Sequence, residues 1–235
     1  MNELVFIGIA IFALSLSLVA FRLGKIYIFA LIAIYSLTMN IFVLKQFTIF
    51  GFMAGGGNAL YGAIFLLTDL LSEHYEKKDA FKAVILGFFT IIVFVILTQS
   101  LLLYVPNNYD FAHEHLSALF SLIPRILFGS LFAYIIAQSL DVFIYDKIKI
   151  WTNGKYLFLR NNGSTLISQF VDTVLFTAIG MTNFSFLPFD GVFQPSQFWE
   201  IVLLTYFLKV IVALIDTPFI YLSYKFLPEE LKNKK

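Results

Sequence analysis

Seven long apolar runs decide what this chain of 235 residues can fold into. A helix needs roughly 20 mainly apolar residues to cross the hydrocarbon core of a bilayer. The chain is 60% hydrophobic and 13% charged, whereas a soluble domain is about 25% charged. We therefore expect an all-α integral membrane protein, and not a cytosolic enzyme, a nucleic-acid-binding domain or a disordered chain. The expected spans are 4–21, 26–44, 58–75, 80–105, 119–144, 161–184 and 198–226.

The pattern of these runs favours helices that stay in the mature chain. The runs are continuous and do not alternate between apolar and polar residues, as barrel strands would. The first run ends at Arg22 without an obvious cleavage site, so we expect a retained span and not a removed signal peptide. The connecting loops, of about 15 residues at most, are too short to bury a core. Residues 1–235 are therefore expected to form one transmembrane domain.

Basic residues gather in alternate loops, and this predicts the orientation of the chain. Cytoplasmic loops of membrane proteins carry an excess of Lys and Arg. Thirteen of the 16 basic residues lie at or beside the connections after the first, third and fifth runs, or at the C-terminus. The opposite loops, 106–117 and 185–197, contain none. We expect seven spans in the cell (inner) membrane, with the N-terminus outside and the C-terminus in the cytoplasm.

The segment Gly51–Gly57 (GFMAGGG) interrupts the apolar pattern before the third span. Four glycines in seven residues are incompatible with a stable helix. Two interpretations stay open. The segment is either a turn on the outer face or a re-entrant segment that lines a cavity, where irregular backbone is tolerated at membrane depth. Asn58 follows as the expected N-cap of the third helix.

Polar residues within the spans point to an internal site. Ionisable groups inside a span cost about 2.5–3.5 kcal/mol each and are functional by default. Those in the expected spans are Asp69, Arg125, Asp141, Asp172, Lys209 and Asp216. Helical spacing places polar and aromatic residues on one stripe of each of four spans. The stripes are Asn58, Tyr61, Phe65, Asp69 and Glu73; Tyr134, Gln138, Asp141 and Tyr145; Asn161, Thr165, Ser168, Asp172 and Phe176; and Tyr206, Lys209, Ala213 and Asp216. We expect these four faces to surround a cavity.

The depth of these groups follows from a rise of about 1.5 Å per residue. Asp172 and Lys209 both fall near the middle of the membrane, so we expect them to be neighbours that form an ion pair. The alternative is that this pair only fixes the order of the helices. Asp141 and Asp216 are expected nearer the cytoplasm as an anionic ring, or else solvated at the interface. Arg125 lies on a different face from Asp141, and its alternative is to snorkel outward.

The chain offers little for catalysis or metal binding, and we expect no enzyme, cofactor or metal site. All three histidines lie at span ends or in loops, so an embedded serine nucleophile would have no His base. The absence of Cys excludes thiolate chemistry and Cys-ligated metals. His113, Glu114 and His115 resemble a metal-binding tract weakly. A cavity lined with polar and aromatic groups is typical of a transporter of small solutes.

Four blocks of sequence follow one another along the chain in a recognisable order. They are NALYGAIFLLTDLLSEHYEKK from Asn58, PRILFGSLFAYIIAQSLDVFIYDKIK from Pro124, LFLRNNGSTLISQFVDTVLF from Leu157 and TYFLKVIVALIDTPF from Thr205. Together they resemble the queuosine precursor transporter family, also called the vitamin uptake transporter family. The resemblance covers residues 58–224, and more loosely the first two spans. It implies a six-helix core with an extra N-terminal helix. Glu76 departs from the family pattern, which has a glycine there, at a helix end.

This resemblance implies import of 7-deazaguanine bases, the precursors of the modified tRNA nucleoside queuosine. A flat base stacks on Tyr or Phe, and its edge suits Asp, Asn and Gln. The substrate-facing candidates are Asn58, Tyr61, Asp69, Gln138, Asp141, Asn161, Gln169 and Asp172, with Arg125, Lys209 and Asp216 as supporting charges. The net negative charge of the spans would tolerate a base that carries a cationic amine. The neutral nitrile-bearing precursor stays equally open.

Two other functions remain open at this stage. One is the substrate-binding subunit of an energy-coupling-factor vitamin transporter, which would need an ATPase partner. The other is a non-transport membrane scaffold. For a transporter, the expected partners are a small-molecule base and the lipid bilayer, without nucleic acid or an ATPase; homo-oligomerisation stays open. Proton coupling through Asp69 or Asp172 and facilitated diffusion with trapping inside the cell are the two energetic alternatives.

Overall fold

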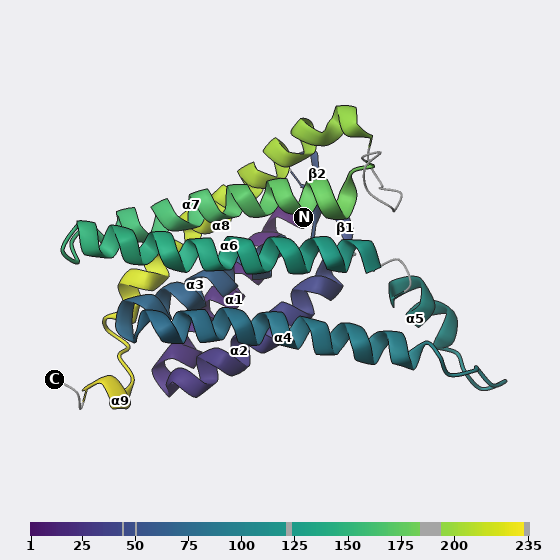
Figure 1. Ribbon diagram of the computed structural model, residues 1–235, viewed down its shortest axis with the longest axis horizontal. Coiled ribbons are helices and arrows are strands. Elements are labelled where there is room, and N and C mark those ends of the chain that lie inside the picture. The colour runs from purple at the N-terminus through teal and green to yellow at the C-terminus, as the bar shows by residue number, and fades with distance from the viewer. Residues whose placement is uncertain (44, 50, 121–123, 184–193, 233–235) are drawn as a thin grey trace.

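The computed structural model describes residues 1–43, 45–49, 51–120, 124–183 and 194–232, and this part of the chain is helical apart from one hairpin. Figure 1 shows the long helices side by side along the longest axis, with the hairpin and α5 at one end and α9 at the other. The elements are α1 (Asn2–Leu23), α2 (Lys25–Phe42), β1 (Gln46–Ile49), β2 (Phe52–Gly55), α3 (Asn58–His74), α4 (Lys77–Leu101), α5 (His113–Phe120), α6 (Pro124–Trp151), α7 (Leu157–Phe176), α8 (Phe198–Ser223) and α9 (Glu229–Lys232). A π-helical turn, η1 (Thr177–Met181), continues α7, and a 3₁₀ turn, η2 (Pro195–Gln197), precedes α8.

Six helices in the described part of the chain are long and apolar enough to cross a membrane, namely α1, α2, α4, α6, α7 with η1, and α8. The protein is therefore a multi-pass membrane protein. The remaining long helix, α3, has 17 residues and is the centre of the bundle, because it packs against α1, α2, α4, α6 and α8. Its residues Ala59–Ser72 are all buried. Thus α3 presents its polar side chains to other helices on every side.

The expected spans lie on these helices with different ends. The largest difference is in the fifth span, where the helix begins at Pro124 and continues to Trp151, well beyond the expected end at residue 144. Proline suits the first turn of a helix, where its missing N–H has no partner to lose. The longer helix places Lys149 beside the end of α3, where its ammonium donates to the Ser72 and Glu73 carbonyls. The expected outer loop 106–117 also contains the start of a helix, α5.

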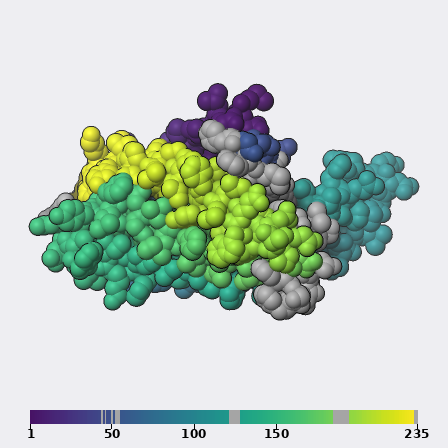
Figure 2. All heavy atoms as spheres, turned by 90° about the horizontal axis from the view of Figure 1, so that it is seen from above, coloured from purple at the N-terminus to yellow at the C-terminus, as the bar shows by residue number. Residues whose placement is uncertain are grey.

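Figure 2 shows α7 and α8, in green and yellow, covering one face of the molecule. The teal end of α4 and α5 extends beyond the bundle at one end. All four helices that carry the expected polar stripes meet, since α7 packs against both α6 and α8, and α3 packs against α6 and α8. Residues of the stripes contact one another across these helices, as in the hydrogen bonds of Tyr61 with Asp172, Tyr145 with Glu73 and Asn161 with Asp216.

The glycine-rich segment forms part of a β-hairpin. Strand β1 pairs antiparallel with β2, with Gln46 opposite Gly55, and Gly51 adopts a positive φ of 81° between the strands. Gly57 then passes so close to α2 that a Cβ atom there would lie 2.8 Å from the Met39 carbonyl oxygen. The expected N-cap is wrong by one residue, since Gly57 is the N-cap and Asn58 is the first helical residue. The side chain of Asn58 is thereby left for the site described below.

Close backbone packing at Gly129 generates a stability prediction. A Cβ atom on Gly129 of α6 would lie 2.6 Å from both the Cα and the N of Gly180 in η1, and backbone atoms cannot swing aside. We expect Gly129→Ala to force the two helices apart and to destabilise the protein by about 1–3 kcal/mol, in the range of overpacking substitutions. Thermal unfolding of the purified protein in detergent measures the change. Gly8→Ala in α1 is the matched control, because a Cβ atom there meets nothing within 4 Å. Equal unfolding temperatures for the two variants would contradict the packing described here.

Candidate functional site

A cavity lies at the end of the bundle that carries the hairpin. Its outer part has a volume of about 350 Å³ and continues into a smaller inner part of about 50 Å³. The two parts share Val43, Asn58, Phe176 and Lys209. Gly51 and Gly55 of the hairpin segment line the outer part, so this segment both turns the chain and lines a cavity. The combined space falls within the range of about 300–1,000 Å³ that is common for small-molecule sites.

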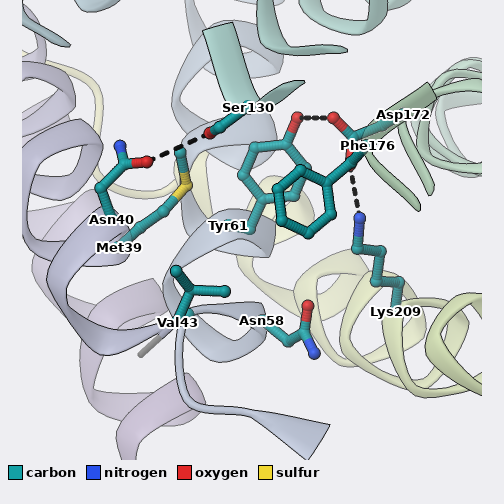
Figure 3. Close-up of a pocket in the computed structure, with 10 residues that line it drawn as sticks. Met39, Asn40, Val43, Asn58, Tyr61, Ser130, Asp172, Phe176 and Lys209 are labelled. Atoms are coloured by element: carbon teal, nitrogen blue, oxygen red, sulfur yellow. Dashed lines mark hydrogen bonds and ion pairs between the residues drawn. The ribbon is translucent and has the colours of Figure 1, made fainter. Parts of the chain in front are cut away.

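The floor of the inner part is a buried charge pair with a tyrosine. The Lys209 ammonium of α8 lies 2.5 Å from Asp172 Oδ2 of α7, which confirms the expected ion pair. The Tyr61 hydroxyl of α3 donates to Asp172 Oδ1 at 2.5 Å, and Lys209 Nζ lies 4.8 Å from the centre of the Tyr61 ring. Figure 3 shows these three side chains converging from three helices. Because Lys209 balances Asp172, the floor carries no net charge.

Amide and aromatic side chains line the walls above this floor. The rings of Phe176 and Tyr61 both line the inner part, together with the Asn58 side chain, as Figure 3 shows. On the opposite wall, Ser130 Oγ of α6 donates to Asn40 Oδ1 of α2 at 3.1 Å. The inner part therefore combines flat aromatic surfaces with amide and hydroxyl groups above a neutral charge pair, whereas the outer part also has the Glu200 carboxylate in its lining.

Sequence analysis missed Asn40, Ser130 and Met39 as lining residues. The available signal was in α2, where Ser36 and Asn40 lie one helical turn apart in an otherwise apolar run. Both are buried, and the Asn40 side-chain amide donates to the Ser36 carbonyl at 2.7 Å. Ser130 could not be found in this way, because a serine in a membrane helix more often bonds to its own backbone or to a neighbouring helix.

Most of the other predicted substrate-facing residues are buried below the floor and do not line either part of the cavity. Thr68 Oγ1 donates to Gln138 Oε1, Ser168 Oγ to Asp141 Oδ1 and Asn161 Nδ2 to Asp216 Oδ1, at 3.3, 2.9 and 2.9 Å respectively. The interpretation of Asp141 and Asp216 as solvated interfacial groups is wrong, because both are 0% exposed. The residues of this buried layer are Asp69, Gln138, Asp141, Asn161, Gln169 and Asp216.

The opposite end of the bundle is closed by a network around Glu73. The Arg160 guanidinium of α7 makes a two-fold contact with the Glu73 carboxylate, at 2.8 and 2.5 Å. The hydroxyls of Tyr145 and Tyr224 donate to the same carboxylate, and the Lys149 ammonium lies 3.5 Å from it. Sequence analysis placed Arg160 among the loop cations, but it is 2% exposed. The remaining candidate, Arg125, lies in α6, and its side chain is outside the part of the chain that the structure describes.

Comparisons with known proteins identify the family of the chain. Residues 55–223 match the family described as "Putative vitamin uptake transporter". The chain is 36% identical over 211 residues to the "Probable queuosine precursor transporter" of Bacillus subtilis (strain 168), with 89% of each chain covered. No solved structure matches the chain significantly. The family match spans α3 to α8, which supply the floor of the cavity, the buried layer and most of the closed end. This multi-pass membrane protein belongs to the vitamin uptake transporter family.

Proposed function

We propose that this protein imports queuosine precursors, the 7-deazaguanine bases, across the cell membrane. The observation that carries the proposal is a cavity with aromatic, amide and hydroxyl walls at one end of a bundle whose other end is closed. The related Bacillus subtilis protein is named as a queuosine precursor transporter, which supports the same substrate class. A flat heterocycle fits between aromatic rings, and an Asn side chain can both donate to and accept from its edge.

The charge of the inner part of the cavity favours a neutral base. From the sequence, we expected the net negative charge of the spans to tolerate a cationic amine. That expectation summed all the span carboxylates, but Asp172, in the inner part, is already paired with Lys209. An amine that bound Asp172 would have to displace the Lys209 ammonium, and an unpaired buried charge costs several kcal/mol. We therefore propose that the nitrile-bearing precursor is preferred over the aminomethyl-bearing one.

The direction of transport follows from a seven-span arrangement, in which α3 crosses the membrane within its shell of neighbouring helices. The distribution of basic residues favours the N-terminus outside and the C-terminus in the cytoplasm. In this orientation the cavity faces outward, and the network around Glu73 closes the cytoplasmic side. The conformation would then be the one that receives a base from outside.

Uptake by cells that cannot make queuosine, with this protein as the sole importer, tests the function. We expect labelled 7-deazaguanine bases to enter, and Asn58→Ala to reduce uptake at low substrate by about five- to tenfold, as loss of one hydrogen bond of about 1 kcal/mol or more predicts. Asn108→Ala, in the exposed connection between α4 and α5, is the matched control and should leave uptake unchanged. Failure of every base to enter, with the protein confirmed in the membrane, would refute the proposal. Co-purification of an ATPase required for uptake would instead favour an energy-coupling-factor subunit.

Substrate preference tests the charge of the floor. In Lys209→Gln, Asp172 loses its cation and becomes available to an amine, so we expect the preference to move from the nitrile towards the amine by tenfold or more. A charge-assisted hydrogen bond of about 1.5–3 kcal/mol accounts for that change. Competition between the two unlabelled bases for uptake of a labelled one gives the ratio. Lys45→Gln, at an exposed position between α2 and β1, controls for loss of positive charge. An unchanged ratio in Lys209→Gln would place the amine away from Asp172.

Cysteine labelling tests the topology, since the chain contains no native Cys. Thr48→Cys, Glu76→Cys and Asn108→Cys place one thiol each in the hairpin, between α3 and α4, and between α4 and α5. We expect an impermeant thiol reagent to label the first and third in intact cells, and the second after permeabilisation. If α3 does not cross the membrane, Thr48→Cys and Glu76→Cys will instead react from the same side.

A further inference from the structure

Three buried carboxylates lie together below the floor of the cavity. Asp69 of α3, Asp141 of α6 and Asp216 of α8 are each 0% exposed. Asp69 interacts electrostatically with both of the others, and Asp141 also interacts with Asp216. Asp69 is eight residues beyond Tyr61 along α3, or about 12 Å at the helical rise. The cluster is therefore a separate layer below the substrate cavity.

The cations of the layers above and below the cluster are engaged elsewhere. Lys209 pairs with Asp172 in the layer above, and Arg160 and Lys149 contact Glu73 in the layer below. No ion pair joins any of the three carboxylates to a described cation. A buried carboxylate without a counter-ion is strongly unfavourable, and three of them together are more so. Something other than a side-chain cation must compensate this charge.

The hydrogen bonding of the cluster shows what is missing. Ser168 Oγ donates to Asp141 Oδ1, and Asn161 Nδ2 donates to Asp216 Oδ1. Both oxygens of Asp69, the second oxygen of Asp141 and the second oxygen of Asp216 have no described donor. Among the possible donors of this layer, the Thr165 hydroxyl and the Gln138 amide nitrogen are also buried without a partner, so the unpaired carboxylate oxygens outnumber them. The layer therefore has more buried acceptors than donors.

A proton on this cluster removes one of the three negative charges and supplies one of the missing donors. The carboxyls of Asp69 and Asp141 are close enough to hydrogen-bond to each other once one of them is protonated. The described residues contain no group of three acidic or imidazole ligands placed to hold a metal ion. We infer that Asp69 and Asp141 share a proton and form the proton-binding site that couples transport to proton movement. The coupling to transport rests on the proposed function, whereas the shared proton does not depend on it.

The groups that face the pair identify its surroundings. Those that interact with the pair itself are Glu73 and Tyr61 of α3, Tyr145 of α6 and Asp216 of α8. Around these groups, Tyr134 of α6 interacts with Tyr61, Arg160 of α7 pairs with Glu73, and Lys209 of α8 pairs with Asp172 of α7. Tyr61 joins the two layers, because its hydroxyl donates to Asp172 and also interacts electrostatically with Asp141. A base that stacks on Tyr61 would therefore contact a residue whose interaction with Asp141 changes when Asp141 gains or loses a proton.

Infrared spectroscopy of the purified protein in lipid detects the proton directly. We expect a C=O band from a protonated carboxyl at neutral pH, which shifts in D₂O and disappears in both Asp69→Asn and Asp141→Asn. Asparagine keeps the shape of the side chain and brings its own donor, so both variants are expected to fold. Asp146→Asn is the matched control, because Asp146 is a partly exposed carboxylate on α6 that pairs with Lys77 at 2.8 Å. Absence of the band in the wild type, or its survival in both variants, would overturn the shared proton whatever the protein transports.

Proteoliposomes separate coupling from transport. Exchange of labelled for unlabelled base requires no gradient, so it reports the proposed function alone. We expect an acidic exterior to accelerate net uptake at least fivefold in the wild type and in Asp146→Asn, and to have no effect in Asp69→Asn, which should still exchange. Wild-type exchange that is indifferent to the proton gradient would refute the coupling and leave the function standing. Loss of exchange with every base would refute the function, while the infrared band would still decide the proton site.

Discussion

The contact of Asp172 with Lys209 and Tyr61 is the interaction on which the site depends. It joins α7, α8 and α3 at one level, and it forms the floor of the cavity. Breaking a buried ion pair from one side costs about 3–5 kcal/mol, because the remaining charge has no water to solvate it. The same pair neutralises the floor electrostatically. The inner part of the cavity thus presents aromatic rings, amides and hydroxyls above a compensated carboxylate.

Below this floor, the same four helices repeat the use of polar groups in layers. The upper layer contains Asp172 and Lys209, the middle layer Asp69 and Asp141, and the lower layer Glu73 with Arg160. Successive layers differ in their charge balance: the upper layer is balanced, the middle layer is short of positive charge, and in the lower layer two cations contact Glu73. A proton shared by Asp69 and Asp141 would reduce the negative charge of the middle layer, which no described side-chain cation does. The layers therefore have separable roles, although their residues lie on the same stripes.

Helical periodicity was sufficient to predict which faces turn inward, but not which of their residues line a space. The stripe of α3 places Tyr61 and Asp69 on the same side, and the structure buries both. Whether a side chain lines a cavity or is packed between helices depends on partners from other helices. Asn40 and Ser130 contact each other from α2 and α6, and no spacing within one helix reveals this. Arg160 was misread for the same reason, since its position next to a basic loop hid its contact with Glu73 on α3.

The closed end has the opposite design from the floor. Glu73 is a single carboxylate that receives donors from α6, α7 and the segment after α8, and Lys149 also binds the carbonyls that end α3. Bidentate contact between Arg and a carboxylate is geometrically specific and strong. Several hydrogen bonds therefore converge on the two oxygens of Glu73 at this end. Opening it requires Glu73 to release or carry its partners as a unit. In the proposed transport cycle, movement of α3 would do this while also moving Tyr61 and Asp69, because all three side chains belong to that one helix. A central helix that carries a residue of every layer can thereby link base binding, protonation and opening on the far side.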